Sequence, residues 1–189
     1  MENVDDFLKQ HLREQIGMEE HLCSIIENQI SEIDETDFSD AKSLLINTKE
    51  VLEKQFDPLN KMLDKLEKDT EIVRAKAVAG NGAGNTKLSG DAEQIKKRIS
   101  SILRDDYSAL NLITMSNTLL HTIALALNCQ DIAETALKHL QNLAPLVVKI
   151  GELLPDVVTR ELRTGSAKID LAVAKIALQN AQLAWRNAL

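Results

Sequence analysis

The chain has 189 residues with a net charge of −7, and 44% of them are hydrophobic but only 3% are aromatic. This length suits one domain, and the scarcity of aromatic residues, Gly and Pro favours helices over strands. An acidic surface of this kind argues against nucleic acid or an anionic membrane as the main partner. We therefore predict a single all-α domain over residues 1–189, built as a bundle of long helices.

Charge and cysteine content bear on where the protein is located. Residues 1–70 carry 18 acidic and 8 basic side chains, whereas residues 71–189 carry 11 and 14. The two cysteines, Cys23 and Cys129, are far apart, and the first residues are acidic where a secretory signal would be basic. The longest apolar run, residues 110–127, is interrupted by polar residues that include Asn111, Thr114, Asn117 and His121, so a membrane span is not expected. These features predict free thiols, a cytoplasmic location and no membrane contact.

Two long helices are predicted within residues 1–69, which form a helical pair. The first runs from about Asp5 to Ile33 and the second from about Phe38 to Asp69. Each carries a face of mostly apolar residues spaced by three and four, which is typical of helices that pack along their length. The two faces comprise Leu12, Ile16, Glu19, Cys23, Ile26, Ile30 and Ile33, and Ala41, Leu45, Thr48, Leu52, Phe56, Leu59, Leu63 and Leu66. Pro58 is expected to kink the second helix.

A Gly-rich crossover loop is predicted at residues 70–90, before a second helical part at residues 91–165. A loop of this length suits a bundle that is not simply up-down-up-down. The next helix is expected to start near Asp91 and to break near Asp105–Asp106, because an unbroken helix to residue 127 would be roughly 55 Å long. Asn128 suits its end.

The rest of the chain is predicted to contain a helix interrupted by prolines and then a C-terminal helix. The interrupted helix begins at Asp131 and is expected to be divided at Pro145 and Pro155. The C-terminal helix covers residues 166–189, starts at the cap residue Ser166 and is mostly apolar. So wide an apolar face must be covered by the bundle or by a partner subunit. We therefore expect a homodimer, formed through this helix or through the acidic face of residues 1–70.

Glu19 is the charged residue on the apolar face of the first helix. A buried carboxylate costs several kcal/mol unless it is paired, hydrogen-bonded, protonated or bound to a metal. Two interpretations follow. Either the carboxylate bonds a buried Thr, Asn or His or lies at a water-filled end of the bundle, or it is a metal ligand. Glu19 is thus the candidate metal-binding residue.

The segment LREQIGMEEHL at residues 12–22 resembles the first helix of small bacterial ferritin-like stress proteins. The segment LALNCQDIAE at residues 125–134 is similar to the turn between their third and fourth helices, and the order of elements is similar over residues 5–155. The resemblance implies a ferritin-like four-helix bundle with a crossover, to which the C-terminal helix is an addition. Catalytic members of that family hold two irons with one Glu from each of two helices and Glu-x-x-His from the other two.

Matched residue by residue, only Glu19 corresponds to one of these iron ligands. No Glu-x-x-His occurs, because the residues three positions before the four His are Leu8, Met18, Thr118 and Ala136. The second helix offers Thr48 where a Glu is expected, and the fourth offers Gln141 and Asn142. A di-iron centre needs about four carboxylates to balance its charge. We therefore expect the ferritin-like shape without a functional di-iron site, without a cofactor and without catalytic residues.

A polar stripe lies on the central helix and comprises Asn111, Thr114, Thr118 and His121. It is a candidate polar pocket for a small ligand, or a set of buried polar groups that bond each other and nearby carbonyls. The sequence thus favours a non-enzymatic ferritin-like interaction or scaffold module, a homodimer open to a further protein partner and, by resemblance, connected with stress. The alternatives are a metal-dependent oxidoreductase of di-iron type with unusual ligands, and a small-molecule-binding bundle that uses the stripe around His121.

Overall fold

The structure is a computed structural model that describes residues 4–33, 37–74, 98–164 and 169–187. Nearly all of these residues are helical and none of them lies in a strand, which confirms the all-α fold. They form α1 (Val4–Glu32), α2 (Ser39–Arg74), α3 (Ile99–Ala126), α4 (Gln130–Thr164) and α5 (Ala172–Arg186). The first two helices match the predicted pair, except that α2 continues beyond residue 70, where the loop was expected to begin.

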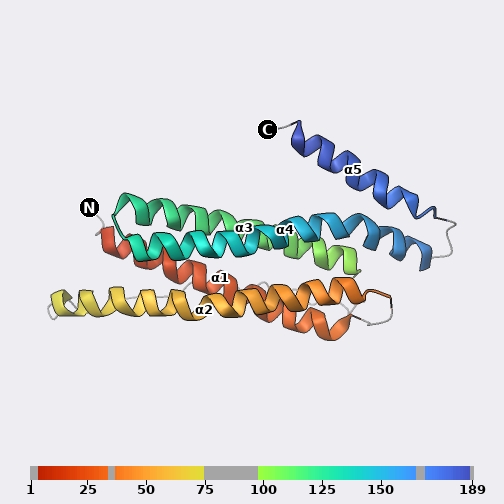
Figure 1. Cartoon of the computed structure of the whole chain (residues 1–189). Coiled ribbons are helices and arrows are strands. Elements are labelled where there is room, and N and C mark those ends of the chain that lie inside the picture. Colours follow the sequence, from red (N-terminus) through yellow and green to blue (C-terminus); the bar gives the residue numbers. More distant parts are fainter. Residues whose placement is uncertain (1–3, 34–36, 75–97, 165–168, 188–189) are drawn as a thin grey trace.

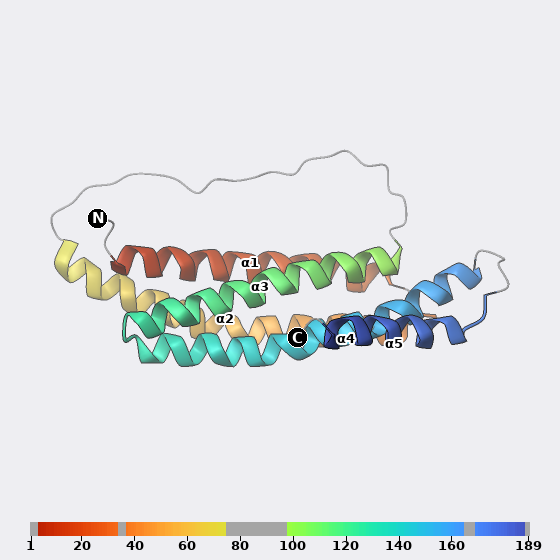
Figure 2. The same ribbon diagram turned by 90° about the horizontal axis from the view of Figure 1, so that it is seen from above.

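Helices α1 to α4 form a bundle of two antiparallel pairs (Figure 1, Figure 2). α1 pairs with α2 and α3 pairs with α4, while α1 also packs on α3 and α2 on α4. α2 ends at the end of the bundle opposite to the one where α3 begins, so these two helices run parallel. The residues between them, which include most of the predicted Gly-rich loop and the helix start predicted at Asp91, lie outside the described ranges.

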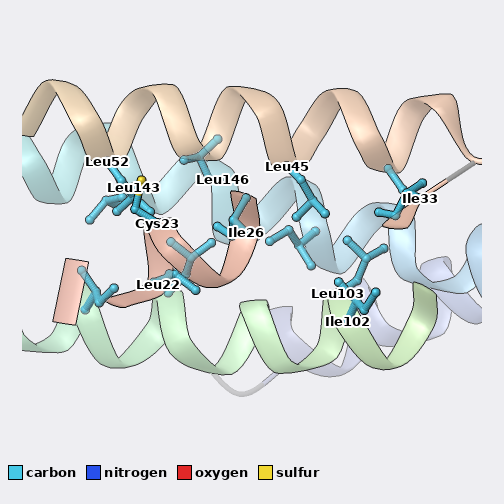
Figure 3. Packing of buried hydrophobic residues seen from close by; sticks show 14 of the residues in the cluster. Leu22, Cys23, Ile26, Ile33, Leu45, Leu52, Ile102, Leu103, Leu143 and Leu146 are labelled. Carbon is cyan, nitrogen blue, oxygen red and sulfur yellow. The ribbon is translucent and has the colours of Figure 1, made fainter. Parts of the chain in front are cut away.

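The core consists of two apolar clusters that follow one another along the bundle axis. The first cluster draws side chains from all four helices, as Figure 3 shows for Leu22, Cys23, Ile26, Ile33, Leu45, Leu52, Ile102, Leu103, Leu143 and Leu146. The second is built from Leu8, Leu12, Ile16, Leu59, Leu120, Ala124, Ile132, Ala133 and Ala136. Burying one large aliphatic side chain stabilises the fold by about 1.5–3 kcal/mol. These two clusters therefore provide the main driving force for packing the four helices.

α3 is continuous, so the predicted break at Asp105–Asp106 is wrong. Asp106 is only 1% exposed and faces α1. There, Gln29 Nε2 donates a hydrogen bond to Asp106 Oδ1 at 3.1 Å. The carboxylate thus has a polar partner inside the bundle, and α3 keeps its helical path instead of turning Asp106 out to solvent.

α4 is also a single helix, although we expected Pro145 and Pro155 to divide it. α2 likewise continues through Pro58. A proline inside a helix removes one backbone donor and costs about 3 kcal/mol. Four large side chains around the two prolines of α4 are buried and contribute about 1.5–3 kcal/mol each, namely Leu143, Leu146, Ile150 and Val157. Burial of this face therefore outweighs the interruption that the prolines favour.

The C-terminal helix α5 packs on α4 but stands apart from the rest of the bundle in Figure 1. It begins at Ala172, whereas the predicted cap Ser166 lies outside the described residues. Ala174 is its buried residue, whereas Ile176, Leu183 and Trp185 are 54%, 58% and 69% exposed. Within the single chain, most of the apolar surface of α5 is therefore uncovered.

The turn that joins α3 to α4 is built around Asn128, the residue predicted to end the helix. Its φ of 56° lies in the left-handed region. The N–H of Cys129 bonds to the Ala124 carbonyl at 2.8 Å and that of Asn128 to the Leu125 carbonyl at 3.1 Å. This pair of bonds is a Schellman motif, which satisfies the last carbonyls of a helix. It reverses the chain so that α4 runs back along α3.

We expect Asn128→Ala to lower the free energy of unfolding by about 1 kcal/mol, because a residue with a Cβ and no polar side chain is strained at positive φ. Asn128→Gly should leave that free energy unchanged or raise it, because Gly adopts this conformation freely. Chemical denaturation of the three proteins measures both effects. If the Ala variant were as stable as the Gly variant, the left-handed turn would not be the element that joins α3 to α4.

Candidate functional site

Between the two apolar clusters, four helices each contribute polar side chains to one level of the core. We call these five residues the polar layer: Gln15 and Glu19 from α1, Gln55 from α2, Asn117 from α3 and His139 from α4. Each is at most 2% exposed. Buried groups of this kind must hydrogen-bond to one another or carry a function, because desolvating them without partners costs free energy.

The heptad spacing of α1 places Gln15 and Glu19 in this layer. The buried face of α1 follows alternating steps of four and three through Leu8, Leu12, Gln15, Glu19, Leu22, Ile26, Gln29 and Ile33. The predicted face followed Ile16 and Cys23, which are also buried but each lie one residue after a position of this central line. Glu19 is therefore among the predicted residues and Gln15 is not, although the spacing extended back to Leu8 includes Gln15.

Glu19 accepts a hydrogen bond from its own helix and lies at the level of polar groups from α2 and α4. Gln15 Nε2 donates a hydrogen bond to Glu19 Oε1 at 2.6 Å, which is a pair spaced by one helical turn. On α4, His139 Nδ1 lies 4.0 Å from the same oxygen. Gln55 Nε2 of α2 approaches the backbone carbonyl of His139 at 3.5 Å. The layer thus connects α1, α2 and α4 through polar groups at one level.

Burial makes the uncharged forms of both titratable groups in the layer more stable. Desolvation raises the pKa of Glu19 to about 7, although hydrogen bonds from Gln15 and Asn117 act in the opposite direction. Desolvation, together with the charge of Lys138, lowers the pKa of His139 to about 4. Near neutral pH the imidazole is therefore uncharged, and Glu19 is divided between carboxylic acid and carboxylate.

The hydrogen bonds within the chain do not saturate the layer. Five of its buried polar atoms have no hydrogen-bond partner among the described residues, namely Gln15 Oε1, Glu19 Oε2, Gln55 Oε1, Asn117 Oδ1 and His139 Nδ1. An unpaired buried polar group costs about 1–3 kcal/mol. The layer is therefore less favourable for stability than an apolar core layer of the same volume would be.

The polar layer does not fit the di-iron centre of catalytic ferritin-like proteins. It supplies one carboxylate and one imidazole, where such a centre uses Glu from two helices and two Glu-x-x-His pairs. Thr48, which stands where a Glu was expected, is buried and bonds to the Leu44 carbonyl at 2.8 Å. Gln141 and Asn142 are exposed. Within the described ranges, no group of three or more His, Cys, Asp or Glu side chains is placed to hold a metal ion.

The predicted polar stripe lies along the side of α3 that faces α4 rather than inside the polar layer. His121 Nδ1 is 2.8 Å from the Ala133 carbonyl of α4. The other three bond to carbonyls of their own helix: Asn111 to Tyr107, Thr114 to Asn111 and Thr118 to Thr114. The structure therefore does not bring the four residues together around one cavity. The residue of α3 that reaches the layer is Asn117, which was not among the predicted candidates.

The described residues form several surface clefts, of which two lie near residues discussed above. One of about 720 Å³ lies between α2 and the α3–α4 turn and is lined by Lys61, Lys65, Cys129 and Asp131, among others. The other, of about 450 Å³, lies under α5 and is lined by Tyr107, Asn111, Val148, Gly151 and Trp185, among others. Asn111 is the one stripe residue in its lining. Neither cleft opens onto the residues of the polar layer.

Comparison of the chain with protein-family models, with curated proteins and with solved structures finds no match. A functional proposal for this chain therefore rests on the geometry of its own residues.

The titration of Glu19 predicts a pH dependence of stability that Glu19→Gln removes. Because the folded-state pKa of about 7 lies above the ordinary value of 4.5, the contribution of Glu19 is fully present below pH 4.5 and is lost as the pH rises through 7. The free energy of unfolding of the native protein should therefore fall, relative to that of Glu19→Gln, by on the order of 3 kcal/mol between about pH 5 and about pH 8.

Denaturation of both proteins across this pH range measures that difference. The shifted pKa of His139 acts in the opposite direction at acidic pH, but it is present in both proteins and largely cancels from the comparison. Parallel stability curves for the two proteins would show that Glu19 titrates at an ordinary pKa and is not desolvated.

Proposed function

We propose that the chain is a non-enzymatic interaction module, a ferritin-like helical bundle that assembles with a protein partner through exposed apolar surface. The supporting observation is a set of large apolar side chains on the outside of the molecule that are 47% to 69% exposed: Leu112, Met115, Leu119, Val148, Ile176, Leu183 and Trp185. Soluble monomers rarely expose contiguous apolar patches beyond a few hundred Å². Surface of this kind on α3, α4 and α5 is typical of proteins that work in assemblies.

The ferritin-like part of the proposal is supported by the order and direction of the helices. Two antiparallel pairs with α2 parallel to α3 form an arrangement that requires a long crossover, as in ferritin-like bundles (Figure 2). The chemistry of the core differs, because the polar layer offers Glu19 and His139 but no second carboxylate. A shared arrangement of helices does not imply a shared activity.

The small-molecule alternative has less support than an interaction role. Its four stripe residues bond to helix carbonyls, and only Asn111 contributes to the cleft under α5. The metal-dependent alternative has one carboxylate in the polar layer, Glu19, and within the described ranges no group of three or more His, Cys, Asp or Glu side chains is placed to hold a metal ion.

Iron binding and molecular mass, measured together on the full-length protein, test the proposal. After anaerobic incubation with excess Fe(II) and removal of loosely bound metal, we expect particles that contain more than one chain and no stoichiometric iron. About two irons per chain, with oxygen consumed on exposure to air, would overturn the proposal and support the oxidoreductase alternative. The Glu19→Gln variant is the matched control, because it removes the carboxylate of the polar layer and should then lose that iron.

A further inference from the structure

α3 carries two heptad seams on opposite sides. Residues of the inner seam face the bundle and are at most 2% exposed: Leu103, Asp106, Leu110, Ile113, Asn117, Leu120 and Ala124. The outer seam has the same alternation of steps of three and four and comprises Ser108, Leu112, Met115, Leu119, Thr122 and Ala126. All six outer residues are exposed. A helix that repeats a heptad seam on two sides is suited to packing against helices on both sides.

The outer seam is apolar at its centre and uncharged along its length. Leu112 is 61% exposed, Met115 is 66% exposed and Leu119 is 47% exposed. Ser108, Thr122 and Ala126 complete it without introducing a charge. An exposed helical face in a soluble protein normally carries charged residues. Here the sequence from residue 107 to residue 127 contains no Asp, Glu, Lys or Arg.

We propose that the outer seam of α3 binds the same seam of a second copy of this chain, antiparallel and about a two-fold axis at the level of Asn117. This proposal rests on the proposed interaction function and names its surface and its partner. Two-fold symmetry requires a surface that is complementary to itself. The residue sizes of the seam meet that requirement, because they are small at the two ends and large in the middle.

The antiparallel register pairs residues whose numbers add to 234. Met115 then packs against the partner's Leu119, Leu112 against the partner's Thr122, and Ser108 against the partner's Ala126. Large residues meet at the centre of the seam, and the small end residues allow the helices to approach closely. No like charges meet along the seam, because it has no charged residue. The seam therefore fits its own copy without any change of conformation.

The exposed apolar area also suits a dimer of standard size. Leu112, Met115 and Leu119, with Leu137 and Val148 on the adjoining side of α4, are 38% to 66% exposed. At about 100 Å² each, these five side chains present roughly 500 Å² of apolar surface. A standard interface buries about 800 Å² per partner, of which somewhat more than half is apolar. α5 packs on α4, and the cleft beneath it is lined by Val148 but by no residue of the outer seam.

A lipid bilayer is the rival occupant of this surface. α3 is long and apolar enough to cross a membrane by length and composition. Its inner seam, however, carries the buried Asp106 and Asn117, which bond within the bundle. The net charge of −7 also disfavours an anionic membrane surface. A second copy of the chain covers the apolar side chains of the outer seam without disturbing the bundle.

Two complementary variants test the pairing on the full-length protein. Met115→Lys and Leu119→Glu should each weaken dimerisation at least 100-fold in analytical ultracentrifugation, because each buries a charge against an apolar residue. Mixed in equal amounts, the two variants should recover a dimer. In that heterodimer the introduced lysine faces the introduced glutamate, while the native Leu119 and Met115 meet at the other symmetry-related contact. A parallel pairing, which sets like positions against each other, gives no such recovery.

Leu125→Glu is the matched control, because Leu125 is also exposed on α3, at 50%, but lies outside the outer seam. It should dimerise as the native protein does, and circular dichroism should show all the variants folded.

A monomeric native protein, an assembly unchanged by Leu119→Glu, or a mixture that stays monomeric would each overturn this pairing. If Leu119→Glu left the assembly unchanged, the interaction function could still act through another face. That function is tested separately by the iron-loading experiment. Sedimentation with vesicles of neutral phosphatidylcholine that is abolished by Leu119→Glu would overturn the pairing and assign the seam to lipid.

Discussion

The carboxyl group of Glu19 lies in the middle of a bundle whose adjoining core layers are hydrocarbon. Because this group is fully buried, it is stable only as an acid or with hydrogen-bond donors at its oxygens. Gln15 supplies a donor from one turn away, and the packing of α4 brings His139 to the same level. Sliding any of these helices along its neighbours would move a polar side chain into an apolar cluster. The polar layer thus ties the register of the helices to the placement of one carboxyl group.

The same chain distributes its apolar side chains over more surface than its core can bury. α3 shows this most clearly, because its inner seam packs inside the bundle and its outer seam is exposed to solvent. α5 adds to the excess, since its contact with α4 buries Ala174 and leaves Trp185 exposed. Some polar residues, in contrast, are buried in the core, among them Glu19 and Asn117. The buried polar residues thus lower the stability of the core, while the exposed apolar side chains can contribute free energy to binding a partner.

Much of the fold follows from local patterns, and its errors come from local rules that tertiary packing overrode. The spacing of apolar residues predicted α1 and α2, and Asn128 was correctly expected to end α3, because left-handed backbone is a local property. The predicted interruptions at Pro145 and Pro155 were wrong, because burial of the surrounding large aliphatic side chains outweighs the loss of two backbone donors. Within the site, Glu19 stood out as a charge on an apolar face, whereas Gln15 and Gln55 did not, because uncharged amides do not conflict as strongly with such a face.

By itself, the sequence determined that the chain is helical, where most of its helices lie, and that one carboxylate would have to be accommodated inside. These properties depend on spacings of three and four residues, which a reader of the sequence sees directly. Only the tertiary structure decided which side chains surround Glu19, because Gln55, Asn117 and His139 lie far along the chain on three other helices. It also decided which face of α3 is covered, because a helix with two apolar seams does not specify from its own sequence which one turns inward.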